Sequence, residues 1–172
     1  QVYLHKTGLV AEQLLMRLLK RAKELTKQGA VLPASKALSY FLKTSITFKG
    51  FNKTVLDTFS ELDDYDIISA MKSWVETDDF VLSTLSKMLL NRDLLKIEIK
   101  SEPFSENILS ETKEALMSTY QLTKNEASYF VFSGDIVNQA YRMDKDAINL
   151  LTKSNKIIDV AQASDQLNLK AL

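Results

Sequence analysis

The pattern of apolar and polar positions is helical over most of the chain. From Gly8 to Gln28, apolar side chains recur at intervals of three and four residues, as on the buried stripe of an amphipathic helix. Further helices are predicted over residues 34–43, 54–62, 63–75, 80–90 and 105–121. The 172 residues include only four glycines and two prolines, so helices are rarely interrupted. The sequence therefore predicts a mainly α-helical protein with a bundle-like core.

Several predicted helices begin at residues that favour a helix N-terminus. Asp63 has the position of an N-cap with Asp66 three residues later, and Asp79 precedes the next apolar run. Thr123 and Glu126 have the spacing of a capping box. A metal site is the alternative for the acidic cluster at 63–66. We interpret these carboxylates as caps instead, because acidic residues in a first turn offset the helix macrodipole.

Three stretches change to the shorter period of strands. Residues 95–100 are predicted as a half-buried strand, 129–134 as a buried strand, and 147–152 with 156–159 as a hairpin. One more short helix is predicted over 160–167. We therefore expect a helical region over 1–100 that ends in a short strand, followed by a small α+β subdomain over 101–172.

Composition and charge narrow the class of protein. The chain has 22 basic and 22 acidic residues, so no overall field attracts nucleic acid or membranes, although a local patch could. It has no cysteine, which excludes disulfides and thiolate metal sites. No apolar run reaches the roughly 18 residues of a membrane span, and no signal peptide is recognisable. We expect a cytoplasmic protein with neither a membrane nor nucleic acid as its partner.

The first residues bring together groups that can bind an anion. Tyr3, His5 and Lys6 place a phenol, the only histidine of the chain and an ammonium just before a strongly apolar helix. Basic side chains then follow on the side of that helix opposite to most of its apolar residues. They are Arg17, Lys20, Arg21, Lys23 and Lys27. We interpret this basic face as a solvated surface.

Two motifs resemble a known family. Tyr3-x-His5-Lys6-Thr7 before an amphipathic helix resembles the segment after the last metal-ligand aspartate of HD-domain (His-Asp) phosphohydrolases, in particular the deoxynucleoside triphosphate triphosphohydrolase branch. Asn91-Arg92-Asp93-Leu94-Leu95-Lys96 resembles that branch's Tyr/Asn-Arg-x-Leu-Phe-Lys element, with leucine in place of phenylalanine. The order of elements in the C-terminal part is also similar, apart from the family's final strand.

The resemblance implies roles for five residues. Tyr3 would pack against the sugar of the substrate, whereas His5, Lys6, Arg92 and Lys96 would hold the phosphates of a nucleoside triphosphate, as substrate or effector. Each has a plainer alternative. Arg92 could bond the carbonyls at a helix end, Lys96 could lie on the wet side of a strand, and Tyr3 could simply pack at the start of a helix.

The metal site of that family is missing from the sequence. HD-domain enzymes bind a divalent ion through a histidine, a His-Asp doublet and a distant aspartate, and the ion activates water for attack on phosphorus. This chain has one histidine and no His-Asp doublet. We therefore name no catalytic residue and no metal ligand, and we expect the divalent metal in a part upstream of Gln1.

The sequence is compatible with two functions. The first is the C-terminal, helical accessory portion of an HD-domain phosphohydrolase that converts a deoxynucleoside triphosphate to nucleoside and triphosphate, in a chain that is truncated and forms homo-oligomers. The second is a non-enzymatic helical protein-interaction module. Its basic helix face would contact a partner protein.

Overall fold

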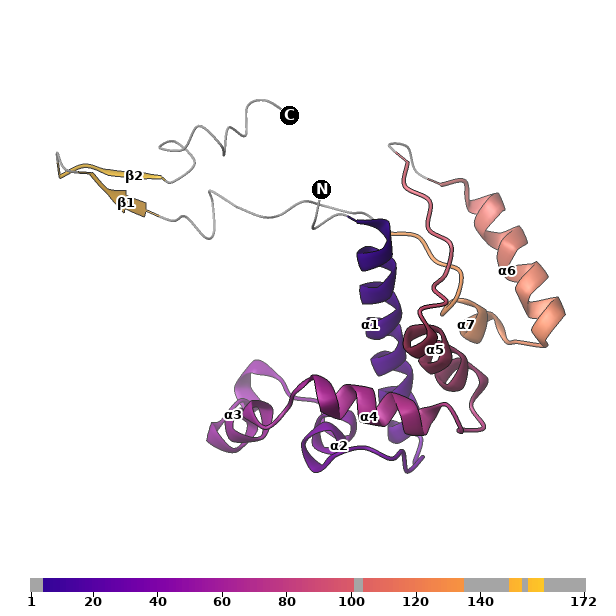
Figure 1. Ribbon diagram of the computed structural model, residues 1–172, viewed down its shortest axis with the longest axis horizontal. Coiled ribbons are helices and arrows are strands. Elements are labelled where there is room, and N and C mark those ends of the chain that lie inside the picture. Colours follow the sequence, from indigo (N-terminus) through magenta and orange to yellow (C-terminus); the bar gives the residue numbers. More distant parts are fainter. Residues whose placement is uncertain (1–4, 101–103, 135–148, 153–154, 160–172) are drawn as a thin grey trace. The chain divides into compact units, whose positions relative to one another are not determined.

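The computed structural model describes residues 5–100, 104–134, 149–152 and 155–159, which divide into two units, Gln1–Phe132 and Ser133–Leu172. The described elements of the first unit are helical (Figure 1). They are α1 (Lys6–Lys27), α2 (Lys36–Lys43), the 3-10 helix η1 (Phe48–Gly50), α3 (Lys53–Ser60), α4 (Asp64–Trp74), α5 (Phe80–Asn91), α6 (Glu106–Tyr120) and α7 (Lys124–Ala127). The prediction of a mainly helical protein is confirmed. The first unit extends past residue 100 and includes α6 and α7.

The predicted caps position the starts of these helices. The Asp63 carboxylate accepts the amides of Tyr65 and Asp66 at 2.8 and 3.1 Å, and the Asp66 carboxylate accepts the Asp63 amide at 2.9 Å. Thr123 and Glu126 form the second predicted capping box, at the start of α7. Both predictions are confirmed. The cap of α2 is Ser35, so Pro33 lies before the helix rather than in its first turn.

The core is built along α1, which packs against α2 and α5, while α4 packs against α5. Leu14, Leu18 and Ala22 of α1 are completely buried, as are Trp74 and Leu82 on the facing helices. Full burial of one such leucine contributes about 1.5–3 kcal/mol. The Trp74 indole N–H donates to the carbonyl of Pro33 at 2.9 Å, which ties α4 to the segment before α2. Among the described helices, none combines the length and the apolar character that crossing a bilayer requires.

The predicted strand at 95–100 was wrong, because no strand is assigned there. The alternation matches burial only over residues 95–98, because Ile99 is 45% exposed. Leu95 and Ile97 pack against the core, whereas Lys96 and Glu98 are exposed. A strand also needs a second strand whose free backbone amides and carbonyls it can bond. Helices cannot provide this partner, because their amides and carbonyls are bonded within the helix. In the described part of the first unit, the neighbouring elements are helices, so the segment packs without joining a sheet.

The predicted strand at 129–134 was also wrong. The amide of Tyr129 donates to the carbonyl of Glu126, and those of Phe130 and Val131 donate to Ala127. The chain therefore continues turning after α7, and it buries Tyr129 to 2% exposure through that turn. A short apolar run does not by itself distinguish a strand from a buried turn.

The predicted hairpin is confirmed in the second unit. Strands β1 (Asn149–Leu151) and β2 (Ile157–Asp159) are antiparallel, with Leu150 opposite Ile158. Asn155 in the connection has a positive φ of 62°, which asparagine tolerates better than most residues. The helix predicted over 160–167 lies outside the residues that the structure describes.

Candidate functional site

The first predicted site residues lie at the start of α1. His5 is the N-cap, and its Nδ1 accepts the amide of Thr7 at 3.3 Å. Lys6, the first helical residue, is exposed and forms no hydrogen bond or ion pair with the described residues. A cation at the positive end of a helix is unfavourable for the helix itself, whereas an anion there is stabilised. Tyr3 falls outside the described residues.

Arg92 ends α5 in a left-handed conformation, with φ 58° and ψ 28°. The Asp93 amide donates to the Met88 carbonyl at 3.0 Å, which is the long bond of a Schellman turn. Glycine is the usual residue at the left-handed position of this turn. The carbonyls of Met88 and Leu89 thus accept the amides of Asp93 and Arg92. The Arg92 guanidinium has no hydrogen bond or ion pair within the described chain. The alternative role for Arg92, a side-chain cap of those carbonyls, is therefore not observed.

The C-terminal ends of α1 and α6 show how much stability is lost when arginine adopts the left-handed conformation. Helix α1 ends in the same turn with Gly29 at φ 100°, which is the inexpensive solution. Helix α6 ends with Gln121 at φ 54°. A residue with a side chain costs about 1–2 kcal/mol in this conformation, and residues held there cluster at functional sites. The exposed, unpaired guanidinium of Arg92 is thus presented to solvent at a small cost in stability.

Lys96 is held in place by its neighbours. Leu95 and Ile97 pack on the core, while the Lys96 side chain is 86% exposed. Its ammonium lies 3.2 Å from a carboxylate oxygen of Glu98. This hydrogen bond, supported by Lys100, lowers the pKa of Glu98. A phosphate at Lys96 would therefore compete with Glu98 for the ammonium.

Three of the predicted site residues border two helices that pack on each other, whereas Lys96 lies in the irregular segment after α5. His5 and Lys6 begin α1, Arg92 ends α5, and α1 and α5 are in contact. No hydrogen bond or ion pair within the described chain links either residue at the start of α1 to Arg92 or Lys96. Their joint action on one ligand therefore stays a prediction.

Sequence reasoning missed a buried ionic cluster on α1. Arg21, predicted on a solvated face, is only 8% exposed. Its Nε and Nη2 donate to the two carboxylate oxygens of Asp79 at 3.1 and 2.5 Å, and Nη2 lies 3.6 Å from Glu126. Asp79 also caps α5 by accepting the amide of Leu82 at 2.8 Å. The interpretation of the whole basic face as solvated was therefore wrong at Arg21.

The cluster continues to the turn after α7. The Tyr129 hydroxyl donates to Glu24 at 2.5 Å, and burial first, then this hydrogen bond, raises the pKa of Tyr129. The Arg17 guanidinium carbon lies 3.4 Å from the centroid of the Phe132 ring, and burial lowers the pKa of Arg17. These contacts tie α1, α5 and α7 together. A sequence signal existed: Arg21 lies three residues after Leu18 and thus borders the apolar stripe.

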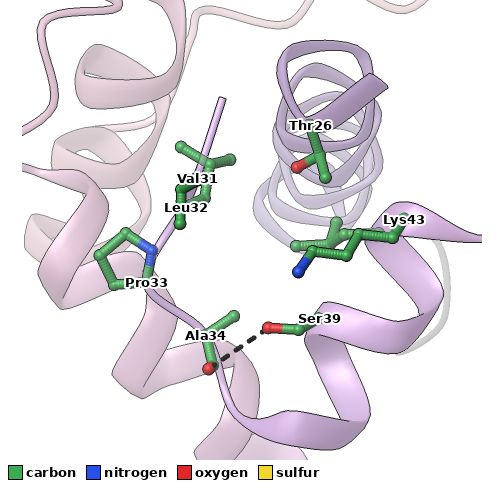
Figure 2. Close-up of a pocket in the computed structure, with 8 residues that line it drawn as sticks. Thr26, Val31, Leu32, Pro33, Ala34, Ser39 and Lys43 are labelled. Atoms are coloured by element: carbon green, nitrogen blue, oxygen red, sulfur yellow. Dashed lines mark hydrogen bonds between the residues drawn. The ribbon is translucent and has the colours of Figure 1, made fainter. Parts of the chain in front are cut away.

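The acidic groups and hollows of the described chain do not add a second site. No group of three or more histidine, aspartate or glutamate side chains is placed there to hold a metal ion. A pocket of about 320 Å³ lies where the end of α1 meets α2 (Figure 2). The Lys43 side chain reaches over it, and the Ser39 hydroxyl donates to the Ala34 carbonyl. None of the predicted site residues lines this pocket.

Comparison with known proteins supports a relation to phosphohydrolases. No family model matches the chain. Over 98% of its length it is similar to a phosphohydrolase of Bacteroides thetaiotaomicron VPI-5482 of known crystal structure, with 40% identity and a TM-score of 0.79. It is also 27% identical over 171 residues to the uncharacterized protein YwfO of Bacillus subtilis (strain 168), covering 95% of this chain. The chain spans 42% and 37% of the lengths of these two proteins.

Proposed function

We propose that this chain is the helical accessory part of a metal-dependent HD-domain phosphohydrolase that converts deoxynucleoside triphosphates to nucleoside and triphosphate. The observation that carries the proposal is the 40% identity to a phosphohydrolase over 98% of the chain. The matched region covers 42% of that enzyme. The metal and the catalytic groups are assigned to the remaining part.

The residues present do not fit the metal of such an enzyme. His5 is the only histidine, and its Nδ1 already caps α1. At the start of α4, the carboxylates of Asp63 and Asp66 form a capping box. No step of the reaction is therefore assigned to residues of this chain.

The role proposed for the chain is to hold phosphate. Arg92 supplies a planar fork that can bind two phosphate oxygens, and Lys6 and Lys96 supply point charges. The exposed guanidinium at a helix end where glycine would fold more easily supports this role for Arg92. His5 and Tyr3 join the site by the resemblance, with Tyr3 against the sugar. The ligand class is a nucleoside triphosphate, bound by a homo-oligomer.

The test uses the protein encoded by the whole reading frame that contains this sequence. Triphosphate release from deoxynucleoside triphosphates with added divalent metal measures the reaction, and calorimetry measures nucleotide affinity. Arg92→Ala should lose more affinity than Arg92→Lys, and binding should weaken as salt rises. Gln121→Ala is the matched control, because Gln121 ends α6 in the same conformation.

Two results would refute the proposal. Absence of hydrolysis, together with a reading frame that encodes no second histidine and no His-Asp doublet upstream of Gln1, would refute the proposed reaction and favour the protein-interaction module. Equal affinity in wild type, Arg92→Ala and Lys96→Ala would leave the reaction in place and remove the phosphate role of these two residues.

A further inference from the structure

Arg17 differs from the other arginine of α1 in having no acidic partner. One turn later, Arg21 is held by Asp79 and Glu126, and the hydrogen bond to Asp79 raises the pKa of Arg21. Burial instead lowers the pKa of Arg17, and no carboxylate offsets that effect. Among the described side chains, the Arg17 Nε is the buried nitrogen or oxygen that lacks a hydrogen-bond partner. Arg17 is therefore a partly buried cation whose charge is not neutralised by any anion of the described chain.

The ring of Phe132 holds this guanidinium in place. The guanidinium carbon of Arg17 lies over the ring, 3.4 Å from its centroid. A ring contact of this kind occupies a face of the guanidinium, whereas the N–H donors lie in its plane and stay available. The two Nη groups form no hydrogen bond with the described residues, and neither of them is a buried atom. The ring therefore fixes a fork of unpaired donors that reaches the surface.

Lys20 adds a second cation on the same side of α1. It follows Arg17 by three residues, which makes the two side chains neighbours on the helix surface. Its ammonium lies 5.7 Å from the ring centroid of Tyr129, in the turn after α7, and 3.9 Å from a carboxylate oxygen of Glu24. Glu24 also accepts the Tyr129 hydroxyl at 2.5 Å and lies 3.8 Å from Arg21. Glu24 thus keeps two partners when Lys20 binds another anion.

We infer that Arg17, Lys20 and Phe132 form a binding site for a phosphoryl group, from inorganic phosphate or a phosphate monoester. The ring orients the guanidinium, the two Nη groups donate to two phosphate oxygens, and the ammonium of Lys20 balances the remaining charge. Two cations favour a phosphoryl group, which carries about 1.5 to 2 negative charges at pH 7, over a carboxylate, which carries one.

This site is separate from the predicted phosphate-binding residues. Lys6 lies eleven residues before Arg17 on the same helix, which is about 16 Å along the axis. One phosphoryl group cannot contact both side chains. The inference is therefore independent of the proposed function, which assigns phosphate to Lys6, Arg92 and Lys96.

A purely structural role for Arg17 is the alternative. The contact with Phe132 would then only join α1 to the segment after α7. A ring contact does not bond the N–H donors, so this role leaves the desolvated charge without compensation. The two roles also differ in their response to phosphate, because a structural contact is complete without a ligand.

The test follows acylation of Lys20 in the native protein made from the whole reading frame. Peptide mass spectrometry measures the rate as inorganic phosphate is added at constant ionic strength, and Lys27 is the exposed internal control on the same helix. Because only the empty site reacts, phosphate at ten times its dissociation constant should slow acylation of Lys20 about tenfold and leave Lys27 unchanged. No slowing by phosphate, or equal slowing by acetate, would overturn the inference.

A parallel titration with phenyl phosphate separates the two sources of the phosphoryl group. Stronger protection of Lys20 by phenyl phosphate than by inorganic phosphate would assign the site to a monoester, because the esterified part then adds contacts. Equal or weaker protection would assign it to free phosphate.

Four variants separate the site from a structural role and from the proposed nucleotide site. Arg17→Met and Phe132→Leu should each abolish the phosphate protection of Lys20, the first by removing the fork and the second by releasing it. Arg17→Lys keeps the charge without the fork, so it should weaken protection even if Arg17→Met does not fold. Arg92→Ala should leave protection unchanged, and loss of protection in this variant would overturn the inference.

The structural role predicts a different result. Arg17→Met or Arg17→Lys would then lower the melting temperature but leave the phosphate protection of Lys20 as in wild type, which would refute the inference. An inactive protein whose Lys20 is protected by phosphate would refute the proposed reaction and keep this site, whereas an active protein without protection would do the reverse.

Discussion

Replacing Arg21 by methionine should lower the free energy of unfolding by about 2–4 kcal/mol. Removing one partner of a fully buried ion pair costs about 3–5 kcal/mol, because the remaining charge is left without compensation. The side chains here keep some contact with water, at 10% exposure for Arg21, 17% for Asp79 and 26% for Glu126, so the expected cost is somewhat smaller. Methionine retains most of the apolar packing of the arginine stem. The decrease in the free energy of unfolding therefore measures the loss of the arginine charge and its hydrogen bonds.

Two matched variants separate this charge from other effects. Asp79→Asn removes the carboxylate but keeps a side chain that caps helices well, so it should cost less than Asp79→Ala, which loses the cap as well. Lys20→Met is the control for a surface charge on the same helix. The Lys20 side chain is 66% exposed and its ammonium lies 3.9 Å from Glu24, so its removal should cost at most about 0.5 kcal/mol.

The assay is urea unfolding followed by circular dichroism. The midpoint should move while the slope stays constant, since the surface exposed on unfolding is unchanged. Arg21→Met combined with Asp79→Asn should cost clearly less than the sum of the two single changes, because the residues share one interaction. The reasoning would be refuted if Arg21→Met cost no more than Lys20→Met, or if the two changes were additive.

Three more predictions concern other parts of the described chain. Hydrogen bonds from Thr123 lower the pKa of Glu126 below its ordinary value of 4.5. The stability that this carboxylate contributes is therefore present above pH 4.5 and is lost as the pH falls through the lower pKa of the folded state. Urea midpoints measured between about pH 7 and pH 3 should fall less steeply in Glu126→Gln than in wild type. Ultraviolet titration of the native protein should show a phenol that ionises above the ordinary tyrosine pKa, and Tyr129→Phe should remove it, because burial and the hydrogen bond to Glu24 raise the pKa of Tyr129. Arg92→Gly should stabilise the fold by about 0.5–1 kcal/mol in thermal unfolding by relieving the left-handed backbone, as should Gln121→Gly, but only Arg92→Gly should weaken nucleotide binding.

Most helices could be predicted because their signals are local. The apolar stripe of α1 recurs at helical spacing, and its end at Gly29 follows from a residue that adopts positive φ freely. The capping boxes at Asp63 and Thr123 depend on residues three apart in the chain. Neighbouring residues alone decide such features, so a single sequence contains them.

The candidate site could be predicted only as a set of residue types. The resemblance nominated His5, Lys6, Arg92 and Lys96, but it did not indicate the left-handed backbone of Arg92 or the pairing of Lys96 with Glu98. The left-handed backbone of Arg92 depends on where α5 ends. The pairing of Lys96 with Glu98 depends on a segment that packs without forming a strand.

The sequence by itself determined the helical class, the helix starts and the hairpin, because periodicity, caps and turn residues act over a few positions. The tertiary structure decided which apolar runs became strands and which charges were buried. Residues 95–100 alternate like a strand but face helices without free backbone groups, and Arg21 meets Asp79 from 58 positions away. Contacts between distant segments have no local pattern, so only the packed chain reveals them.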